Sequence, residues 1–584
     1  MSQEAKEWNY ADFEAGKTPL PRPNMAWNTY GKGIDSVGVD GKPEEIEIPS
    51  PSAEQLLIRI DAVGLCFSDV KLVKQGGSHP KLYGRDLRSE PTRLGHEVSV
   101  TVIEVGDDLA SRFKPGQRLA IQPDIHIDGR STAYGYTIPG GLVQYHLIGS
   151  EVLDGDDGAY VLPVDPELGY AAAALSEPWA CVEASYTQRR RLSPLKGGTM
   201  LIVGSTSDAS TYAFSTGLNA PSTIVLNGVS NQVAELVNSS VSDDCKVVVI
   251  DQTSPAQIAA IATEYTGEAG FDDIITLGVT SGEVIEELAK VIGFRGTMAM
   301  AGTEPLDRYP EIDVGRIHYH YTAFLGTSTG DVSDAYGEAR NRADLVPGGT
   351  TVFVGAAGPM GQMHIQRALE KSDGPDVLIG IDLDDDRIEV AKALLGPLAA
   401  ERSKKLVFVN PTTGTKTTQE LVDAHADGVV DDVVVTVPSG PVMAEASELM
   451  GPDGMLVLFA GVANGTMAPL NMSNVFLHNA QFTGTSGSSI EDQAAVLDKA
   501  QNGSLSPERA VAAVGGIDAG KDGIRALLEG HYAGKVIIFP QLSGLKITSL
   551  ADLADGNEEM KAALGEHTLW NEKAERLLFE KYHA

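Results

Sequence analysis

The spacing of hydrophobic positions changes along the chain, and this change divides it into parts. Between about residues 25 and 190, short runs of β-branched and apolar residues alternate with Gly/Pro turns such as the one at 114–117. Two of these runs cover residues 55–62 and 97–105. The pattern predicts short strands of a small, irregular β-barrel. Helical spacing first appears at residues 171–186.

Further along, near-continuous apolar runs follow Gly-Gly-Thr twice, at residues 197–204 and 348–355. Such runs are typical of buried parallel strands. Two later segments also match in pairs: 295–302 with 453–461, and 324–328 with 482–486. Equivalent residues lie 151 positions apart at Gly197 and Gly348, and 158 apart at Gly326 and Gly484. The repeat predicts two copies of one βα unit; two unrelated α/β domains with similar strands are the alternative. A strand at 534–540 and a mostly helical tail follow.

Composition narrows the class of protein. The chain has 584 residues, 42% of them hydrophobic, which requires several domains. Its net charge of −35 argues against partners such as nucleic acid or an anionic membrane. There is no apolar run long enough to span a membrane, and residues 1–7 do not resemble a secretory signal. Three cysteines are too few for a disulfide framework, so we expect a reduced, cytoplasmic protein.

Four side chains of metal-ligand type follow one another in the predicted β-region: Cys66, His96, Glu97 and Glu177. A catalytic Zn²⁺ takes three protein ligands of these kinds and keeps a fourth position open. Either Glu97 or Glu177 completes a set with Cys66 and His96. The neighbours of Cys66 suit the same chemistry: Ser68 is placed to carry a proton outward, and Asp69 to accept the second ring N–H of His96. Cys181, one helical turn after Glu177, is either close to this metal or a small buried apolar residue.

A glycine-rich turn in the second copy predicts a dinucleotide site. Residues 355–361 follow an apolar strand and open a helical stretch, and Asp382 ends the next strand. The glycines allow a tight turn and let a pyrophosphate reach backbone N–H groups. Asp382 and the acids at 384–386 favour NAD over NADP, while Arg387 is a counter-signal. The candidate cofactor residues are Gly355, Gly358, Pro359, Met360, Gly361, Asp382 and Arg387.

The first copy has lost these features. Ser207 and Ser210 stand where the second copy has glycines, Asp208 adds negative charge, and the second strand ends at Asn227 rather than an acid. Side chains then occupy the space that a pyrophosphate requires. We expect a degenerate, structural unit; a second ligand or regulatory site is the alternative.

These motifs together resemble the zinc-dependent medium-chain dehydrogenase/reductase family. Glutamate at 177 resembles its sorbitol dehydrogenase branch, and further stretches resemble L-sorbose-1-phosphate reductases. The motifs that carry the resemblance are Cys66-Phe67-Ser68-Asp69, Gly95-His96-Glu97, Glu177-Pro178, Pro115-Gly116-Gln117-Arg118, Gly135-Tyr136 to Gly140-Gly141, and residues 355–361. One departure is clear: the chain lacks the four clustered cysteines that hold a structural zinc in many members.

The resemblance implies an α/β protein with four segments. These are a GroES-like β-barrel catalytic domain (1–190), a degenerate Rossmann-like unit (196–345), an NAD-binding Rossmann domain (346–490), and a return to the catalytic domain with a helical tail (491–584). It also implies one catalytic zinc, held by Cys66, His96 and either Glu97 or Glu177, and a proton relay that begins at Ser68. Ser68, Asp69 and Glu97 are the candidate catalytic residues.

The function expected from these features is a zinc-dependent, NAD-linked dehydrogenase/reductase. Its substrate would be a secondary alcohol of a polyol, sugar or sugar phosphate, and we expect a homo-oligomer. The alternatives are a redox-neutral epimerase or lyase that retains NAD, and a non-catalytic sensor.

One basic segment suggests an anionic substrate. Residues 71–93 carry six Lys or Arg and only two acids, an excess of four positive charges in an acidic chain. The segment lies between Cys66 and His96, so we expect part of it at the substrate cleft, where it would attract a phosphate or carboxylate. Arg85, Arg88 and Tyr136 are the candidate substrate residues. The alternative is a solvated loop.

Overall fold

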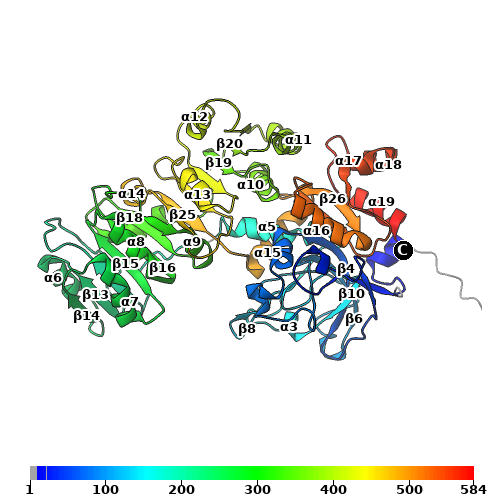
Figure 1. The fold of residues 1–584 in the computed structure, drawn as a ribbon, viewed down its shortest axis with the longest axis horizontal. Helices are drawn as coiled ribbons and strands as arrows, with labels where there is room; N and C mark the ends of the chain where they lie inside the picture. Colours follow the sequence, from blue (N-terminus) through cyan, green and yellow to red (C-terminus); the bar gives the residue numbers. More distant parts are fainter. Residues whose placement is uncertain (1–8, 21–22, 188, 584) are drawn as a thin grey trace, which may run out of the picture. The chain divides into compact units, whose positions relative to one another are not determined.

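The computed structural model describes residues 9–20, 23–187 and 189–583 (Figure 1). The amino-terminal stretch on which the absence of a signal was predicted lies outside them. The chain forms two compact units, Met1–Glu183 with Gly487–Ala584 and Ala184–Ser486. No helix among the described residues has the length and apolar character needed to cross a membrane.

The first unit is built on an eight-stranded, mainly antiparallel sheet in the order β11-β7-β6-β4-β27-β26-β28, with β10 also paired to β4. Every residue of the central strand β4 is buried. It pairs antiparallel with β6 on one side and β27 on the other. The carboxy-terminal part of the chain therefore completes the sheet begun before residue 165. The strands are β4 (Leu56–Leu65), β6 (Glu97–Val105), β7 (Arg118–Ile121), β10 (Tyr145–Ile148), β11 (Val161–Pro163), β26 (Val511–Gly516), β27 (Lys535–Phe539) and β28 (Thr548–Ser549).

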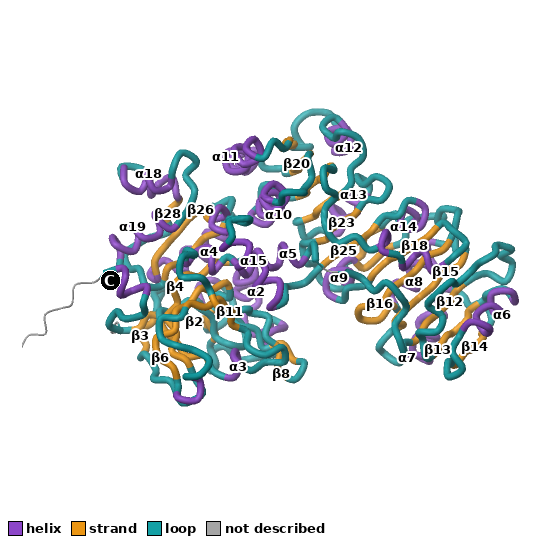
Figure 2. Tube along the Cα trace, turned by 180° about the vertical axis from the view of Figure 1, so that it is seen from behind, coloured by secondary structure: helices purple, strands orange, loops and turns teal. Residues whose placement is uncertain are grey.

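Short strand pairs and helices surround this sheet (Figure 2). The pairs are β1 (Asn24–Ala26) with β3 (Glu44–Ile46), β2 (Asn28–Thr29) with β5 (Thr92–Arg93), and β8 (His126–Ile127) with β9 (Arg130–Ser131). The helices are α1 (Tyr10–Glu14), α2 (Phe67–Gln75), α3 (Ser150–Leu153), α4 (Tyr170–Ala174), α5 (Ser176–Ala184), α15 (Ile490–Gln501), α16 (Gly520–Glu529), α17 (Leu550–Ala554), α18 (Glu558–Leu564) and α19 (Glu572–Tyr582).

The second unit contains two six-stranded parallel sheets with one topology. Their orders are β14-β13-β12-β15-β16-β18 and β21-β20-β19-β22-β23-β25. In both, the first strand is central, the next two strands lie on one side of it, and the remaining three lie on the other side. This is the doubly wound arrangement in which ligands bind at the carboxyl ends of the strands. The fold predicted from the repeated apolar runs, two tandem Rossmann-type units, is confirmed.

In the first copy the elements are β12 (Thr199–Val203), β13 (Thr223–Asn227), α6 (Asn231–Ser240), β14 (Lys246–Ile250), α7 (Ile258–Thr266), β15 (Phe271–Leu277), α8 (Gly282–Lys290), β16 (Ile292–Ala301), β17 (Glu311–Asp313), α9 (Val314–Tyr319) and β18 (Ala323–Thr327).

In the second copy they are β19 (Thr350–Val354), α10 (Pro359–Glu370), β20 (Val377–Ile381), α11 (Asp385–Glu401), β21 (Lys405–Val409), α12 (Thr418–Asp423), β22 (Asp432–Val435), α13 (Gly440–Ser447), β23 (Met455–Leu458), β24 (Met467–Pro469), α14 (Ser473–Leu477) and β25 (Gln481–Gly484). One hydrophobic cluster runs through both copies.

The copies differ most after their first strand. In the second copy four residues separate the end of β19 from the start of α10, whereas the first copy has no helix between β12 and β13. Its residues 204–222 form turns and loop instead. The first copy therefore lacks the helix amino terminus that binds a pyrophosphate in this fold.

Candidate metal and nucleotide sites

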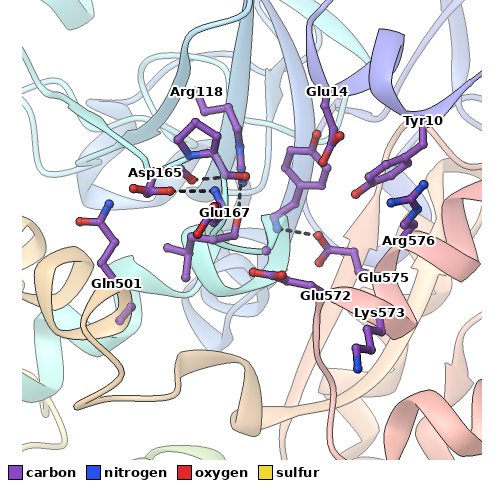
Figure 3. Close-up of a pocket in the computed structure, with 15 residues that line it drawn as sticks. Tyr10, Glu14, Arg118, Asp165, Glu167, Gln501, Glu572, Lys573, Glu575 and Arg576 are labelled. Carbon is purple, nitrogen blue, oxygen red and sulfur yellow. Dashed lines mark hydrogen bonds between the residues drawn. The ribbon is translucent and has the colours of Figure 1, made fainter.

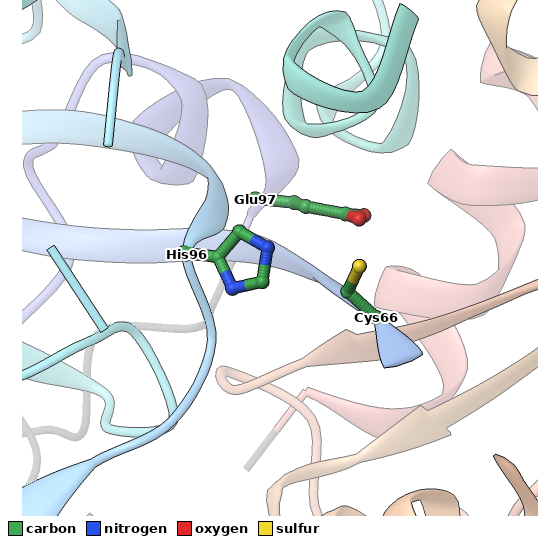
Figure 4. Close-up of side chains that lie close together, drawn as sticks. All are labelled: Cys66, His96 and Glu97. Atoms are coloured by element: carbon green, nitrogen blue, oxygen red, sulfur yellow. The ribbon is translucent and has the colours of Figure 1, made fainter. Parts of the chain in front are cut away.

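Three of the predicted metal ligands converge in the first unit. One donor atom each of Cys66, His96 and Glu97 lies within 4.8 Å of the others (Figure 4). His96 and Glu97 are buried, and Cys66 is partly buried. Thiolate, imidazole and carboxylate are the donors that Zn²⁺ takes in catalytic sites, and three of them leave one coordination position open. The donor set therefore fits a zinc ion.

The central strand pair brings these side chains together. Cys66 follows β4 and is the N-cap of α2, while Glu97 is the first residue of β6 and pairs with Gly64 of β4. Any side chain at Gly64 would overlap the Glu97 carboxylate. Gly64 is therefore required by Glu97, a relation that only the pairing of the two strands reveals.

Asp69 joins the two halves of this group. Its carboxylate accepts hydrogen bonds from the N–H of Cys66 (2.9 Å) and of Gly95 (3.0 Å), and Oδ1 lies 3.5 Å from Nδ1 of His96. Burial alone would raise the pKa of Asp69, but His96 and these N–H donors lower it. Burial likewise opposes the charged form of His96, yet Asp69 raises its pKa well above the usual value. Asp69 Oδ1 thus lies on the Nδ1 side of the His96 ring, although Nδ1 makes no hydrogen bond among the described residues.

Lys535 is a functional-site neighbour that the sequence analysis did not identify. Its Nζ donates to Oε1 of Glu97 at 2.5 Å, and both side chains are buried. Glu97 Oε2 has no hydrogen-bond partner among the described residues. Although burial by itself lowers it, the Glu97 carboxylate raises the pKa of Lys535 to about 12. A lysine opening the buried apolar strand 535–539 was the available signal, because buried lysines are almost always paired.

Glu177 lies on α5 and is also buried, but it is not one of the three converging residues. Burial raises its pKa to about 7, and the charges of Glu97 and Asp124 act in the same direction against His96 and Lys535. Cys181 Sγ lies 3.9 Å from Glu177 Oε1, as expected one turn along a helix. Burial raises the pKa of the Cys181 thiol well above its usual value, which makes it a poor ligand.

Cys66, His96 and Glu97 are called the metal group below. In the basic segment, Lys81 lies nearer this group than the two arginines predicted from the sequence. The Tyr136 ring lies 5.9 Å from the His96 ring, and Lys81 Nζ lies 5.1 Å from the Tyr136 ring centre. Lys81 also pairs with Asp124 at 2.7 Å. Arg85 instead donates to the carbonyl of Thr137, and Arg88 is exposed.

The glycine-rich turn of the second copy has the shape that a dinucleotide requires. Gly355 has φ 81°, which favours glycine, and Gly358 is the N-cap of α10, followed by Pro359 and Met360 in its first turn. A side chain at Gly361 would overlap the carbonyl oxygen of Gly355. Because glycine has no side chain, residues 355, 358 and 361 leave the first N–H groups of α10 unobstructed.

Asp382 stands directly beside this turn. Its Oδ2 accepts from the N–H of Ala357 at 2.9 Å, and its Oδ1 from the N–H of Leu383 at 2.8 Å. Arg387, the counter-signal in the sequence, lies with Nε 3.7 Å from Asp384. The turn and the acid that the sequence placed 21 or more residues apart are thus adjacent.

The equivalent place in the first copy is filled by its own side chains. Asp208 accepts a hydrogen bond from the Tyr212 hydroxyl at 2.7 Å and from the N–H of Ser210 at 2.9 Å. A side chain at Gly278 would come within 2.8 Å of the same carboxylate. Together with the missing helix, this arrangement supports the interpretation of a degenerate copy.

The first unit also contains a polar cavity of about 840 Å³ away from these three ligands (Figure 3). Arg118 donates from Nη1 to the carbonyls of Pro166 and Leu168, and Glu575 of α19 accepts from the N–H groups of Tyr170 and Ala171. These bonds fasten the amino terminus of α4, and α5 with Glu177 follows directly. The residues around the cavity thus hold the start of α4 and, through it, support α5, which carries Glu177.

Comparisons with known proteins agree with this geometry. The family described as alcohol dehydrogenase GroES-like domain matches residues 52–153, and the family described as zinc-binding dehydrogenase matches residues 359–502. Mannitol-1-phosphate 5-dehydrogenase of Aliivibrio fischeri is 23% identical over 92% of this chain and 94% of its own. L-sorbose 1-phosphate reductase of Klebsiella pneumoniae is 25% identical over 53% of this chain and 76% of its own.

Among solved structures, 2R,3R-butanediol dehydrogenase from Bacillus subtilis aligns with a TM-score of 0.50 at 15% identity, covering 88% of this chain and 99% of its own. That likeness concerns the fold alone. The barrel match covers Cys66, His96 and Glu97, and the second match opens at Pro359 beside the glycine turn. Together these matches support an alcohol-dehydrogenase-type oxidoreductase of the zinc-type medium-chain dehydrogenase/reductase family.

Proposed function

We propose that the protein is a zinc-dependent, NAD-linked dehydrogenase/reductase acting on a secondary alcohol of a polyol or sugar, preferentially a phosphorylated one. The observation that carries this proposal is the convergence of Cys66, His96 and Glu97. Polyol-phosphate and sugar-phosphate names among the relatives support the substrate class. Of the two Rossmann-type copies, the second has a glycine-rich turn at residues 355–361 with Asp382 beside it.

In this proposal Cys66, His96 and Glu97 hold the zinc, which would supply a Lewis acid for the alcohol or carbonyl oxygen. Glu97 is favoured over Glu177 as the third ligand because its Oε2 is buried without a partner while its Oε1 is held by Lys535. Asp69 holds the His96 ring so that Nε2 faces the ion. Ser68, partly buried two residues after Cys66, carries the proton of the alcohol outward.

The second Rossmann-type copy holds the cofactor. The first turn of α10 receives the pyrophosphate, because its N–H groups and helix dipole favour an anion. Asp382 accepts hydrogen bonds from the adenosine ribose and repels a 2′-phosphate, which favours NAD. Gly355, Gly358 and Gly361 provide the space for this contact.

Lys81 and Tyr136 are the proposed contacts for the substrate. Lys81 keeps about a third of its side chain exposed while its Nζ is held near Tyr136 by Asp124. An ammonium with unused donors at this place suits a phosphate. Arg85 and Arg88 remain predicted substrate residues, but their contacts point them to Thr137 and to solvent.

A substrate screen with NAD tests the proposal. Purified protein is assayed with polyols, sugars and their phosphates while reduced cofactor is followed by absorbance. We expect turnover of added NAD, one zinc per chain by elemental analysis, loss of zinc and activity in Cys66→Ser, and slower turnover with full zinc in Ser68→Ala. Cofactor that stays bound, with substrate isomerised and no net reduction, would instead establish the epimerase or lyase reading.

A further inference from the structure

The two Rossmann-type copies pack against each other through equivalent elements. Strand β17 of the first copy pairs antiparallel with its counterpart β24 of the second, with Ile312 opposite Ala468. Helix α14 packs on β18, and α9 packs on β25. The labels of α14, β18, α9 and β25 lie near one another in both views (Figures 1 and 2). The contact of α14 with β18 is therefore the contact of α9 with β25 with the two copies exchanged.

The backbone bonds across β17 and β24 are reciprocal. The N–H of Val314 donates to the carbonyl of Thr466, and the N–H of Leu470 donates to the carbonyl of Pro310. Leu470 lies 156 residues after Val314, and Thr466 lies 156 residues after Pro310. One bond is thus the other with the two copies exchanged, which is the relation that a twofold axis creates.

The same exchange holds where a glycine of one copy lies against a helix of the other. A Cβ at Gly326 of β18 would lie 2.7 Å from the Phe476 backbone, and a Cβ at Gly484 of β25 would lie 3.1 Å from the Cα of His318. Gly484 follows Gly326 by 158 residues, and Phe476 follows His318 by the same 158. Each copy uses a glycine to admit the helix of the other.

Reciprocal contacts of this kind define an isologous interface, in which one self-complementary patch meets a second example of itself. Such a patch normally belongs to two identical chains. Here both examples lie in one chain, and the buried residues Ile312, Phe324, Ala468, Phe476 and Phe482 form part of one shared cluster. Joining them in one chain favours their pairing over that of separate chains through effective concentration.

We infer that the first copy is the built-in partner of the cofactor-binding copy and takes the place that a second subunit would occupy across this face. This partner is a second example of the same βα unit. It keeps the interface although its nucleotide turn is degenerate. This role is independent of the proposed catalytic function. It also means that any homo-oligomer of the protein uses another surface.

A disulfide across the strand pair tests the inference on the full chain. Glu311 and Pro469 lie opposite each other, next to the bond from the Leu470 N–H to the Pro310 carbonyl. They are therefore a non-hydrogen-bonded pair, in which the Cα atoms are about 4.5 Å apart. That spacing suits a disulfide. The variant Glu311→Cys/Pro469→Cys is oxidised at several protein concentrations and run without reductant. Glu311→Cys and Pro469→Cys alone control for Cys66, Cys181 and Cys245.

We expect a cross-link within single chains at every concentration, detected as a faster-migrating monomer that peptide mapping assigns to positions 311 and 469. Cross-linked dimers would overturn the inference, because they would show that the patch pairs between chains. Failure of the double variant to cross-link at all would overturn it as well, because the two strands would then not be neighbours.

A second measurement asks whether the cofactor-binding copy depends on this partner. Gly326→Val introduces a side chain against Phe476. Gly396→Val is the matched control, because its added Cβ meets nothing within 4 Å apart from the neighbouring backbone of its own helix. Amide hydrogen exchange is followed in α14 and β25. We expect protection there to fall by about tenfold or more in Gly326→Val only. Unchanged protection in that variant would contradict the inferred partnership.

Discussion

Lys535 and Glu97 form a buried ion pair at 2.5 Å although they are 438 residues apart in the chain. Glu97 opens β6 and Lys535 opens β27, and both strands flank the central strand β4. The lysine holds Oε1 of the carboxylate, while Oε2 has no hydrogen-bond partner among the described residues and is the oxygen that we propose for the metal. Closing the sheet with the carboxy-terminal part of the chain thus also completes the metal group.

Removal of Lys535 should therefore destabilise the protein. Lys535→Met leaves Glu97 buried without its counter-charge, and we expect a loss of about 3–5 kcal/mol in the free energy of unfolding, measured by urea denaturation after metal chelation. Adding Glu97→Gln should recover a large part of that loss. Arg112→Met, which breaks the exposed pair with Asp154 at 3.1 Å, is the control and should cost less than about 1 kcal/mol. Equal effects of the two single substitutions would contradict the buried-pair account.

Glu177 should make the metal-free protein less stable as pH rises. Burial raises its pKa from 4.5 to about 7 in the folded protein, so the folded state binds a proton that the unfolded state releases. The stability that this proton contributes is present below about pH 4.5 and is lost as pH rises through 7. An upper limit for the loss is about 3 kcal/mol.

The check is the urea midpoint between pH 4.5 and 8 with chelator present, compared between wild type, Glu177→Gln and the exposed control Glu167→Gln. Glu177→Gln should remove the decline between pH 4.5 and 7, and Glu167→Gln should retain it. A decline that survives in Glu177→Gln would assign it to another group.

Only the second Rossmann-type copy should bind NAD. Gly361→Ala places a methyl group against the Gly355 carbonyl and forces α10 away from β19, so NAD affinity should fall at least about tenfold, or 1.4 kcal/mol. Ser210→Ala, in the corresponding loop of the first copy, should leave affinity unchanged. Isothermal titration should give one NAD per chain. Two sites of similar affinity would show that the first copy still binds nucleotide.

Lys81 should set the preference for phosphorylated substrates. Lys81→Met removes the ammonium beside Tyr136, and we expect KM for a sugar or polyol phosphate to rise about tenfold while KM for the neutral counterpart changes little. The exposed Arg88→Met is the matched control and should alter neither. The wild-type preference should also shrink as salt rises. Equal kinetics of Lys81→Met with both substrates would remove Lys81 from the substrate site.

The features that the sequence determined are those encoded by neighbouring residues. Apolar runs predicted the strands of both βα copies, glycine spacing predicted the turn at 355–361, and the residues around Cys66 and His96 predicted the metal group. Serines at positions 207 and 210, in place of glycines, likewise predicted that the first copy is a degenerate unit. Local conformation and side-chain chemistry act over a few residues, so a single chain read in order is enough to find them.

Pairing between distant segments was decided only by the tertiary structure. It brought Lys535 to Glu97, favoured Glu97 over Glu177 beside Cys66, and turned Lys81 rather than Arg88 toward Tyr136. It also set the two copies face to face with Ile312 opposite Ala468. Strand register and the burial of charge depend on which surfaces meet, and the free energy of that choice is shared by residues hundreds of positions apart, so no local pattern contains it.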